Sequence, residues 1–545
     1  MKKIRAFGLA LLLLLSLAAC GGGGTKPDAE QPATPPAVEP DKPVVDDEPT
    51  IPLPDENTLV IAIEDEIEGL DVQQISYGNM VHDLVAEPLV VYSTDLTELH
   101  PAFAESFTLT DDYIEFVLPA DARFSNGDKL DAEAVKASTE RFLAISEYVD
   151  DLDTLTSIDV IDERTVRYNF SAPSPYSIAD IASLFCGIVD VAEVGHVGDW
   201  EFNRCPVMNG AYYVDEWVEG SHLVLKRNEY FHTNNPALKN HGLPNFETIV
   251  IRFIPDGEER MRELDAGRVD IAYHAPTYRW AELEANSNYN VWSYQQPGVC
   301  YLNLQTNQEP LRDIRVRQAL TYAVDRDAIN EVLGGIVTPF YGFLVPAQAG
   351  YSAEEEEKLS ETLRYDPEHA RALLAEAGWK DIDGDGIVEK NGEPLSFYMM
   401  IPSDRYSFMT AGGVLEKQFA AIGVDTEVLY EPAEYIKERM RADDYTIGSR
   451  AYEWNDADIL YWCFTEESGY RWEDQELTAL LNTARHINDP DERAEAYVAV
   501  SERLMQDFKA IALYADNFII VSKSNLTGIA TAMDDRVWFN DVVKN

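Results

Sequence analysis

The stretch TIVIRF, at residues 248–253, decides the class of fold. Its β-branched side chains are typical of a buried strand. A stretch with helical character follows at residues 258–266, and a second short apolar run, VDIA, lies at residues 269–272. The order strand, helix, strand predicts an α/β unit, in which the helix carries the chain from one strand to the next.

A second unit of the same kind follows much later in the chain. It consists of a strand at residues 424–430, a helix at residues 434–441 and a strand at residues 445–449. The two units lie on opposite sides of the region around residue 300, so we expect two α/β lobes rather than one sheet. A chain of 545 residues is also too long for a single hydrophobic core.

The charge of the chain excludes one class of partner. There are 97 Asp and Glu residues against 43 Lys and Arg residues, which gives a formal net charge of −54. A surface of this charge repels nucleic acids and anionic lipids. We therefore expect no nucleic-acid binding, and ligands that are cationic, zwitterionic or neutral rather than polyanionic.

The N-terminus predicts an exported protein. The basic residues in MKKIR precede an apolar run at residues 6–19, which is shorter than the roughly 20 residues of a membrane-spanning helix. We interpret residues 1–19 as a signal peptide. Residues 20–56 are rich in Gly, Pro and acidic side chains and predict a disordered linker.

The end of the apolar run indicates a membrane anchor. Leu17-Ala18-Ala19-Cys20, followed by four glycines, resembles the bacterial lipobox, which implies cleavage before Cys20 and acylation of its thiol. The protein would then be a lipoprotein on the outer face of the cytoplasmic membrane or the periplasmic side. An ordinary cleavage site with an incidental cysteine is the alternative.

Four further cysteines can pair in an exported chain. We prefer a disulfide between Cys186 and Cys205, and then one between Cys300 and Cys463, with buried free thiols as the alternative. The spacing does not suit a zinc site.

Motifs of common enzymes are absent from the sequence. There is no GxSxG, HExxH, GxxxxGK[ST] or strand-linked GxGxxG motif, and the histidines are scattered singly. A pair of catalytic carboxylates cannot be recognised among so many acids. We therefore expect a protein that is not an enzyme and uses no cofactor, and we retain a secreted carboxylate-based hydrolase as a competing hypothesis.

Several blocks, in order along the chain, resemble the family 5 extracellular solute-binding proteins, the peptide- and nickel-type receptors of ABC importers. The most specific block is ARFSNGDKLDAEAV at residues 122–135. Other blocks are EGLD at 68–71, VAEPLVVY at 85–92, PAFAES at 101–106, LDAGRVDI at 264–271, LRDIRVRQAL at 311–320, YAVDR at 322–326 and LLAEAGW at 373–379.

This resemblance implies a two-lobe periplasmic-binding-protein-like α/β fold of the class II, or cluster C, type, with a small domain inserted in the first lobe. The implied ranges are residues 57–88, 170–298 and 516–545 for lobe I, 89–169 for the inserted domain, and 299–515 for lobe II. It further implies a monomeric receptor that traps a peptide between its lobes and delivers it to an ABC permease. A receptor for oligosaccharides or metal chelates is the alternative within the same fold.

The resemblance also suggests ligand-binding residues in the segment RAYEWNDAD, at residues 450–458. Oligopeptide receptors carry a similar pattern, in which an Asp pairs with the amino terminus of the peptide and an Arg can meet its carboxylate. Asp456 and Arg450 keep that spacing, although Trp454 falls one residue late. Trp454 and Asp458 are further candidates for ligand binding in this segment. In the alternative interpretation, Asp456 or Asp458 caps the following helix, and Trp454 belongs to a core.

Further candidates for the cleft are Tyr77, Gly78 and Asn79 after the first strand, and Tyr301 and Asn303 on the crossover into lobe II. Each of them could also be an ordinary loop or strand residue.

An acidic loop later in the chain, DIDGDG at residues 381–386, imitates the start of a calcium-binding loop through Asp381, Asp383 and Asp385. Gly392 stands where an EF-hand needs a bidentate Glu, so a turn of a hairpin is the stronger interpretation.

Overall fold

The structure is a computed structural model that describes residues 51–64, 66–403, 405–470, 472–534 and 536–545. The predicted signal peptide, Cys20 and most of the predicted linker lie outside the described residues. Among the described helices, none combines the length and the apolar character that crossing a membrane would require.

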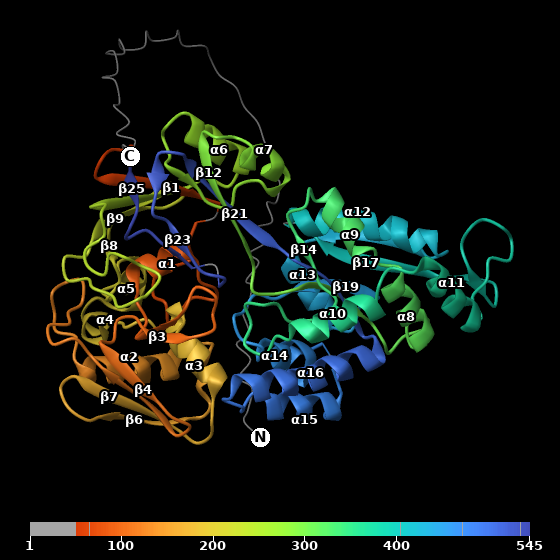
Figure 1. Ribbon diagram of the computed structural model, residues 1–545, viewed down its shortest axis with the longest axis horizontal. Coiled ribbons are helices and arrows are strands. Elements are labelled where there is room, and N and C mark those ends of the chain that lie inside the picture. The colour runs from red at the N-terminus through yellow and green to blue at the C-terminus, as the bar shows by residue number, and fades with distance from the viewer. Residues whose placement is uncertain (1–50, 65, 404, 471, 535) are drawn as a thin grey trace, which may run out of the picture. The chain divides into compact units, whose positions relative to one another are not determined.

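The first lobe is built on a seven-stranded sheet (Figure 1). Its central strand β1 (Thr58–Ile63) runs parallel to β10 (Thr248–Phe253) on one side and to β11 (Ile271–Ala272) on the other. Helix α6 (Gly257–Asp265) connects β10 to β11, which confirms the predicted α/β unit. The remaining strands are β8 (Tyr212–Val218), β9 (His222–Arg227), β12 (Tyr289–Gln295) and β21 (Asn517–Lys523).

The second lobe is built on a separate six-stranded sheet, as the second predicted unit required. Strand β17 (Ser396–Pro402) runs parallel to β18 (Asp425–Glu431) and β19 (Ile447–Ala451), and helix α13 (Ala433–Arg441) connects the last two. The other strands are β13 (Cys300–Leu304), β14 (Thr338–Pro339) and β20 (Ala510–Ala515).

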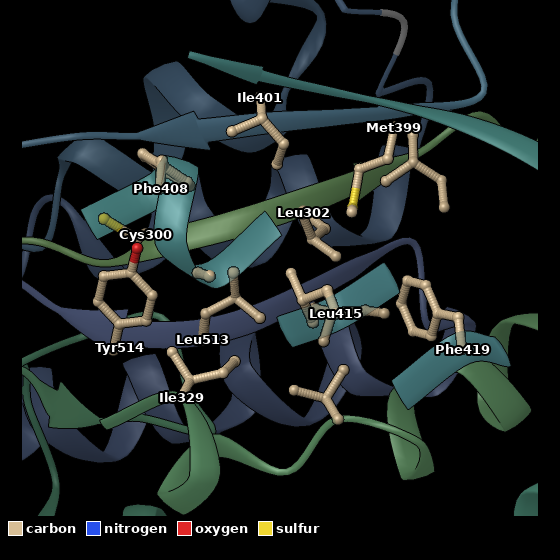
Figure 2. Close-up of a cluster of buried hydrophobic side chains, with 14 of the residues drawn as sticks. Cys300, Leu302, Ile329, Met399, Ile401, Phe408, Leu415, Phe419, Leu513 and Tyr514 are labelled. Atoms are coloured by element: carbon tan, nitrogen blue, oxygen red, sulfur yellow. The ribbon is translucent and has the colours of Figure 1, made fainter. Parts of the chain in front are cut away.

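One hydrophobic core covers this second sheet. Leu302, Met399 and Ile401 project from the strands toward apolar side chains of helix α12 (Tyr406–Ala421), among them Leu415 and Phe419 (Figure 2). All five are buried, and burying such side chains is the main force that holds the helix on the sheet.

A third, antiparallel sheet lies within the range predicted for the inserted domain. Its order is β4 (Ser106–Leu109), β5 (Tyr113–Val117), β7 (Thr165–Phe170), β6 (Leu155–Val160), and helix α2 (Ala132–Ile145) packs against it. Apolar residues of helix α3 (Pro175–Ile181), which was assigned to lobe I, also join this core. Helix α3 thus buries its apolar face in the same core as the third sheet. The boundaries of the inserted domain stay a prediction.

Two short crossovers connect the first sheet to the second. The chain leaves lobe I between β12 and β13 and returns between β20 and β21. The two crossovers contact each other, since the amide nitrogen of Gln296 donates to the carbonyl oxygen of Asp516 at 2.8 Å.

The other helices are α1 (Met80–Val85), α4 (Val191–Val197), α5 (Asp199–Arg204), α7 (Trp280–Glu284), α8 (Ile314–Tyr322), α9 (Arg326–Val332), α10 (Ala353–Thr362), α11 (Pro367–Glu376), α14 (Ile459–Phe464), α15 (Gln475–Ala484) and α16 (Pro490–Asp507). Short 3₁₀ turns are η1 (Val149–Leu152), η2 (Leu184–Cys186), η3 (Thr277–Arg279) and η4 (Glu466–Ser468). Short strand pairs are β2 (Val90–Tyr92) with β3 (Leu99–Pro101), β15 (Glu389–Lys390) with β16 (Glu393–Pro394), β22 (Leu526–Thr527) with β25 (Val543–Lys544), and β23 (Ala530–Thr531) with β24 (Val537–Trp538).

The preferred disulfides are not present. All four described cysteines are unpaired. Cys300 and Cys463 are buried in two different hydrophobic cores, Cys186 packs against the core of the inserted domain, and Cys205 is exposed. The alternative of free thiols, three of them at least partly buried, describes the structure.

Candidate functional site

A cavity of about 310 Å³ is lined by residues of both lobes and of the crossover between them. Lobe I contributes the end of β1, the start of α1, the segment after β11, and residues near the C-terminus. Lobe II contributes Arg405 and Glu453, and Gln296 lies on the crossover. The cavity thus lies outside the carboxyl end of the central parallel strand, where α/β sheets commonly bind ligands.

Tyr77, Gly78 and Asn79 line this cavity, at the place that the sequence interpretation gave them. The Asn79 side chain caps α1 by accepting from the amide nitrogen of Val81 at 2.9 Å, and the ring of His82 accepts from the amide nitrogen of Asn79 at 3.1 Å. A Cβ atom on Gly78 would lie 2.4 Å from a methyl carbon of Leu184. Glycine therefore allows the backbone to approach Leu184 closely at the cavity wall.

An aromatic and acidic cluster forms the wall beside β1. The ring of His274 stacks on Phe518 with 3.9 Å between centroids, and its Nδ1 hydrogen-bonds to the carboxylate of Glu64. Burial raises the pKa of Glu64, but the hydrogen bond and charge of His274, together with the charge of Arg260, outweigh it and lower the pKa. Glu64 is therefore ionised at neutral pH.

An ion pair between Arg405 and Glu453 forms the lobe II wall of the cavity. Arg405, just before α12, donates through Nη2 to Oε1 of Glu453 at 2.5 Å, and Glu453 follows β19. Burial lowers the pKa of Arg405, but the charges of Glu453 and Asp516 outweigh it, so the pKa lies above its usual value. Both side chains are about one-third exposed, which leaves them within reach of a ligand in the cavity.

A second charged group forms part of the lobe I wall. Arg536 donates through Nε to Oδ2 of Asp534 at 2.8 Å, and Asp83 of α1 also lines the cavity. Burial raises the pKa of Asp83 to about 7, an effect that the charge of Arg536 reduces and the charges of Asp534 and Glu87 increase. Acidic side chains therefore predominate here over the single guanidinium.

Asp456, the predicted anchor for a ligand amine, lies elsewhere. Its carboxylate is buried and accepts from both terminal nitrogens of Arg493, at 2.6 and 2.7 Å. Oδ1 also accepts from the amide nitrogen of Asp458 at 2.8 Å. Asp456 is not among the described residues that line the cavity. Its carboxylate already neutralises a buried guanidinium, which leaves it no free face for a ligand.

The neighbouring candidates are also held by partners within the described protein. Asp458 accepts from Nη2 of Arg485 at 2.8 Å, and although it stands at the start of α14, its side chain caps no described amide of that helix. Arg450 packs over the ring of Tyr470, at 4.4 Å from its centroid. These side chains are therefore not among the described residues that line the cavity.

Of the aromatic and crossover candidates, Tyr301 lies in a hydrophobic core, Trp454 packs against another core, and Asn303 is a buried polar residue. Trp454 packs near Phe185, with 6.4 Å between ring centroids. Tyr301 and Asn303, on β13, are 1% and 3% exposed. They are not cavity-lining residues in the part of the chain that the structure describes.

The acidic loop brings its three aspartates close to a fourth carboxylate. Ligand oxygens of Asp381, Asp383, Asp385 and Glu389 all lie within 4.8 Å of one another, on the surface. The amide nitrogen of Gly384 donates to Asp381 at 2.7 Å, so the loop is also held by its own backbone. Calcium binding at this loop stays a prediction.

Sequence reasoning missed most of the charged cavity residues. Glu64, Asp83, His274, Arg405, Asp534 and Arg536 come from separate segments of the chain. Glu453 lies inside the predicted segment, three residues before Asp456, and only the backbone conformation after β19 turns it toward the cavity.

Comparisons with known proteins identify the family. The family model described as bacterial extracellular solute-binding proteins, family 5 Middle, matches residues 98–470. The oligopeptide-binding protein AppA of Bacillus subtilis is 25% identical over 73% of this chain and 72% of its own length. The glutathione-binding protein GsiB of Escherichia coli K12 is 25% identical over 82% of this chain and 86% of its own length.

Solved structures share the fold. NikA from Brucella suis, in complex with Fe(III)-EDTA, has a TM-score of 0.79 at 21% identity and covers 90% of this chain and all of its own. AppA from B. subtilis, in complex with a nonapeptide, has a TM-score of 0.70 at 21% identity and covers 88% of this chain and 98% of its own. The fold is that of two-lobe binding proteins, and the relatives are binding receptors rather than enzymes. The chain belongs to family 5 of the bacterial extracellular solute-binding proteins.

Proposed function

We propose that the protein is a lipid-anchored extracytoplasmic receptor that captures peptides in the cavity between its lobes and delivers them to an ABC import permease. The observation that carries this proposal is a cavity with ionised side chains from both lobes. The names of two relatives, an oligopeptide-binding and a glutathione-binding protein, support peptides as the ligand class.

Closure of the lobes gives the mechanism a physical basis. A ligand that contacts Glu64 or Gly78 on one side and Arg405 or Glu453 on the other binds the closed state better than the open state. It therefore shifts the population toward closure. Closure also removes water, which strengthens each charge pair within the cavity. The permease then distinguishes the closed, loaded receptor from the open one.

Glu453 is the residue that we infer to bind the ligand amine. It is the carboxylate of the segment 450–458 that lines the cavity, whereas Asp456 is occupied by Arg493. A zwitterionic peptide can share the pair, with its ammonium on Glu453 and its carboxylate on Arg405. Backbone at Gly78 and Asn79 adds contacts that do not depend on side-chain identity, which suits tolerance of varied peptides.

The test is calorimetry with di- to hexapeptides, free and N-acetylated. Glu453→Gln should weaken binding of free peptides by about 2–5 kcal/mol, because it leaves the ligand ammonium without its partner. Glu427→Gln, at an exposed position on β18, is the matched control and should leave affinity unchanged. Equal binding of free and N-acetylated peptides by the wild type would overturn the role of Glu453.

The same incubations discriminate a receptor from a hydrolase. A receptor returns its peptide intact after long incubation, which mass spectrometry of the supernatant measures. Cleavage products that depend on Glu64 or Glu453 would instead support carboxylate-based hydrolysis.

Metal chelates are a second candidate ligand class. His274 lines the cavity, and its buried Nε2 atom makes no hydrogen bond to the described protein, so a shift of the ring toward the cavity would make it available to a metal. Solved structures of the same fold bind Fe(III)-EDTA and Ni(L-His). Calorimetry with nickel and histidine would support this class if binding exceeds that of every peptide and is lost in His274→Ala. Tight binding of an oligosaccharide, without binding of peptides or metal chelates, would indicate a receptor for oligosaccharides.

The anchor requires a separate test, because Cys20 lies outside the described residues. Wild-type protein should fractionate with membranes and incorporate labelled fatty acid, and Cys20→Ser should do neither. Membrane association that survives in Cys20→Ser would contradict the lipid anchor.

A further inference from the structure

The lobe I wall carries charged side chains that the proposed binding of a peptide backbone does not use. We propose that Asp83, Asp534 and Arg536 form a subsite for a basic side chain of the ligand, an ammonium or guanidinium group. This inference rests on the proposed function and narrows the ligand class to peptides that contain lysine or arginine.

Arg536 and Asp534 form an ion pair in the lobe I wall. Nε and Nη2 of Arg536 both approach the same oxygen of Asp534, Oδ2, at 2.8 and 2.6 Å. Nη1 donates to the carbonyl oxygen of Ala182 at 3.1 Å. Arg536 therefore occupies one oxygen of Asp534 and fixes the carboxylate in position.

The second carboxylate oxygen of Asp534 has no hydrogen-bond partner in the described protein. Oδ1 is buried and makes no hydrogen bond to any described residue, although the side chain is only 8% exposed and lines the cavity. Buried carboxylate oxygens are nearly always hydrogen-bonded. Because Asp534 lines the cavity, a cationic side chain that enters beside it would supply the missing donor.

Carboxyl groups outnumber basic groups around Arg536. Asp83 lines the cavity close to Arg536 and Asp534, and Glu87 lies behind them, where it accepts from Oγ1 of Thr233 at 2.7 Å. Three carboxylates thus surround one guanidinium. Across the whole cavity, the described lining contains four carboxyl groups (Glu64, Asp83, Glu453, Asp534), two guanidiniums (Arg405, Arg536) and the imidazole of His274. Glu64, Glu453 and Asp534 pair with His274, Arg405 and Arg536, whereas Asp83 has no ion pair with a described residue. A cation would favour the ionised form of Asp83, and an anion would disfavour it.

The net charge of the whole chain also favours a cationic ligand. The formal net charge of −54 concentrates cations near the surface and raises their rate of encounter. The α-amine of the ligand is the other possible source of the ammonium. The experiment separates the two sources, because N-acetylation removes one and replacement of lysine by norleucine removes the other.

The experiment is calorimetry of the full receptor with a set of tripeptides. Lysine or norleucine is placed at each position of trialanine in turn, each with a free and an acetylated amino terminus. In a second set of peptides, arginine replaces lysine and citrulline replaces norleucine. Norleucine and citrulline keep most of the side-chain shape but remove the charge. The receptors are the wild type, Asp83→Asn, Asp534→Asn, and Asp215→Asn, which changes an exposed aspartate of β8 as a matched control.

At one position of the peptide, the wild type should bind lysine about tenfold or more tightly than norleucine, with or without acetylation. This ratio should fall toward one in Asp83→Asn and Asp534→Asn and persist in Asp215→Asn. Because the ratio is taken within one receptor, a variant that folds less well does not imitate the result.

Three outcomes would overturn the inference. Equal affinity of charged and uncharged peptides for the wild type removes the subsite and leaves the peptide receptor intact. A charge preference that disappears on acetylation assigns the site to the α-amine. Failure of every peptide to bind the wild type overturns the subsite and the proposed function together.

Discussion

Asp456 and Arg493 form a two-point ion pair in the interior of lobe II, with Oδ1 and Oδ2 of the carboxylate each within 2.7 Å of one guanidinium nitrogen. Their side chains are each 3% exposed. Asp456 lies just before α14, and Arg493 lies on α16, so the pair joins two parts of the lobe that are 37 residues apart.

Removing this carboxylate should destabilise the protein. Asp456→Asn leaves the Arg493 guanidinium buried without a counter-charge, and we expect the free energy of unfolding in urea to fall by about 3–5 kcal/mol. Peptide affinity of the folded variant should change little. Glu453→Gln should give the reverse pattern, with affinity lost and stability kept. If Asp456→Asn loses affinity but not stability, Asp456 contacts the ligand after all.

Gly298, in the first crossover, permits a close approach to lobe II. A Cβ atom there would lie 1.7 Å from the carbonyl oxygen of Tyr452, a position that no side chain can share. Gly298→Ala should therefore separate the crossover from β19 and lower the melting temperature by several degrees. Gly413→Ala is the control, since no atom lies within 4 Å of the added carbon and the position is inside α12. It should stabilise by up to about 1 kcal/mol.

Asp83 and Glu87 should make stability depend on pH. Burial raises the pKa of each to about 7, so the folded state binds their protons more tightly than the unfolded chain. The free energy of unfolding should then decrease as pH rises from about 4 to about 7, and stay level above that. The expected contribution is about 3–4 kcal/mol per group.

The variant Asp83→Asn with Glu87→Gln should flatten this part of the profile relative to the wild type. Urea unfolding at several pH values measures the difference. Subtracting the two profiles cancels the general repulsion among the other acids of the chain, which also changes with pH. Parallel profiles would show that these two groups titrate normally.

The free thiols predict a definite chemical result. In Cys20→Ser protein unfolded without reductant, a thiol reagent should label Cys186, Cys205, Cys300 and Cys463. In the folded protein, the exposed Cys205 should react first, and the buried Cys300 and Cys463 should react slowly. A fall to two labelled thiols would show that a disulfide forms in the exported protein.

The fold could be predicted because its signals are local. The strand at residues 248–253, its helix and the following strand are each visible within a few residues, and so is the unit at 424–449. The boundaries of the inserted domain are harder to predict. Nothing in the sequence of α3 says which of two neighbouring hydrophobic cores its apolar face joins.

The site could be predicted only in part, because charge pairing is not local. The residues Tyr77 to Asn79 line the cavity as their place after the first strand suggested. The spacing from Arg450 to Asp456 contains no information on Arg493. Arg493 lies on another helix and binds the carboxylate of Asp456. The lobe I wall joins α1 to the C-terminal region, more than 400 residues away, a contact that no local pattern encodes.

The position of β21 has a consequence for how the protein is made. Residues 299–515 are continuous in the sequence, so the second lobe has all its strands while the last residues are still being translocated. The first lobe still lacks a strand at that stage. Strand β21, near the end of the chain, lies between β11 and β12 and pairs with both. A chain emerging from its amino end must therefore keep an open sheet, with exposed strand edges, until the final stretch arrives. Chains that stop before β21 would therefore display these strand edges to proteases.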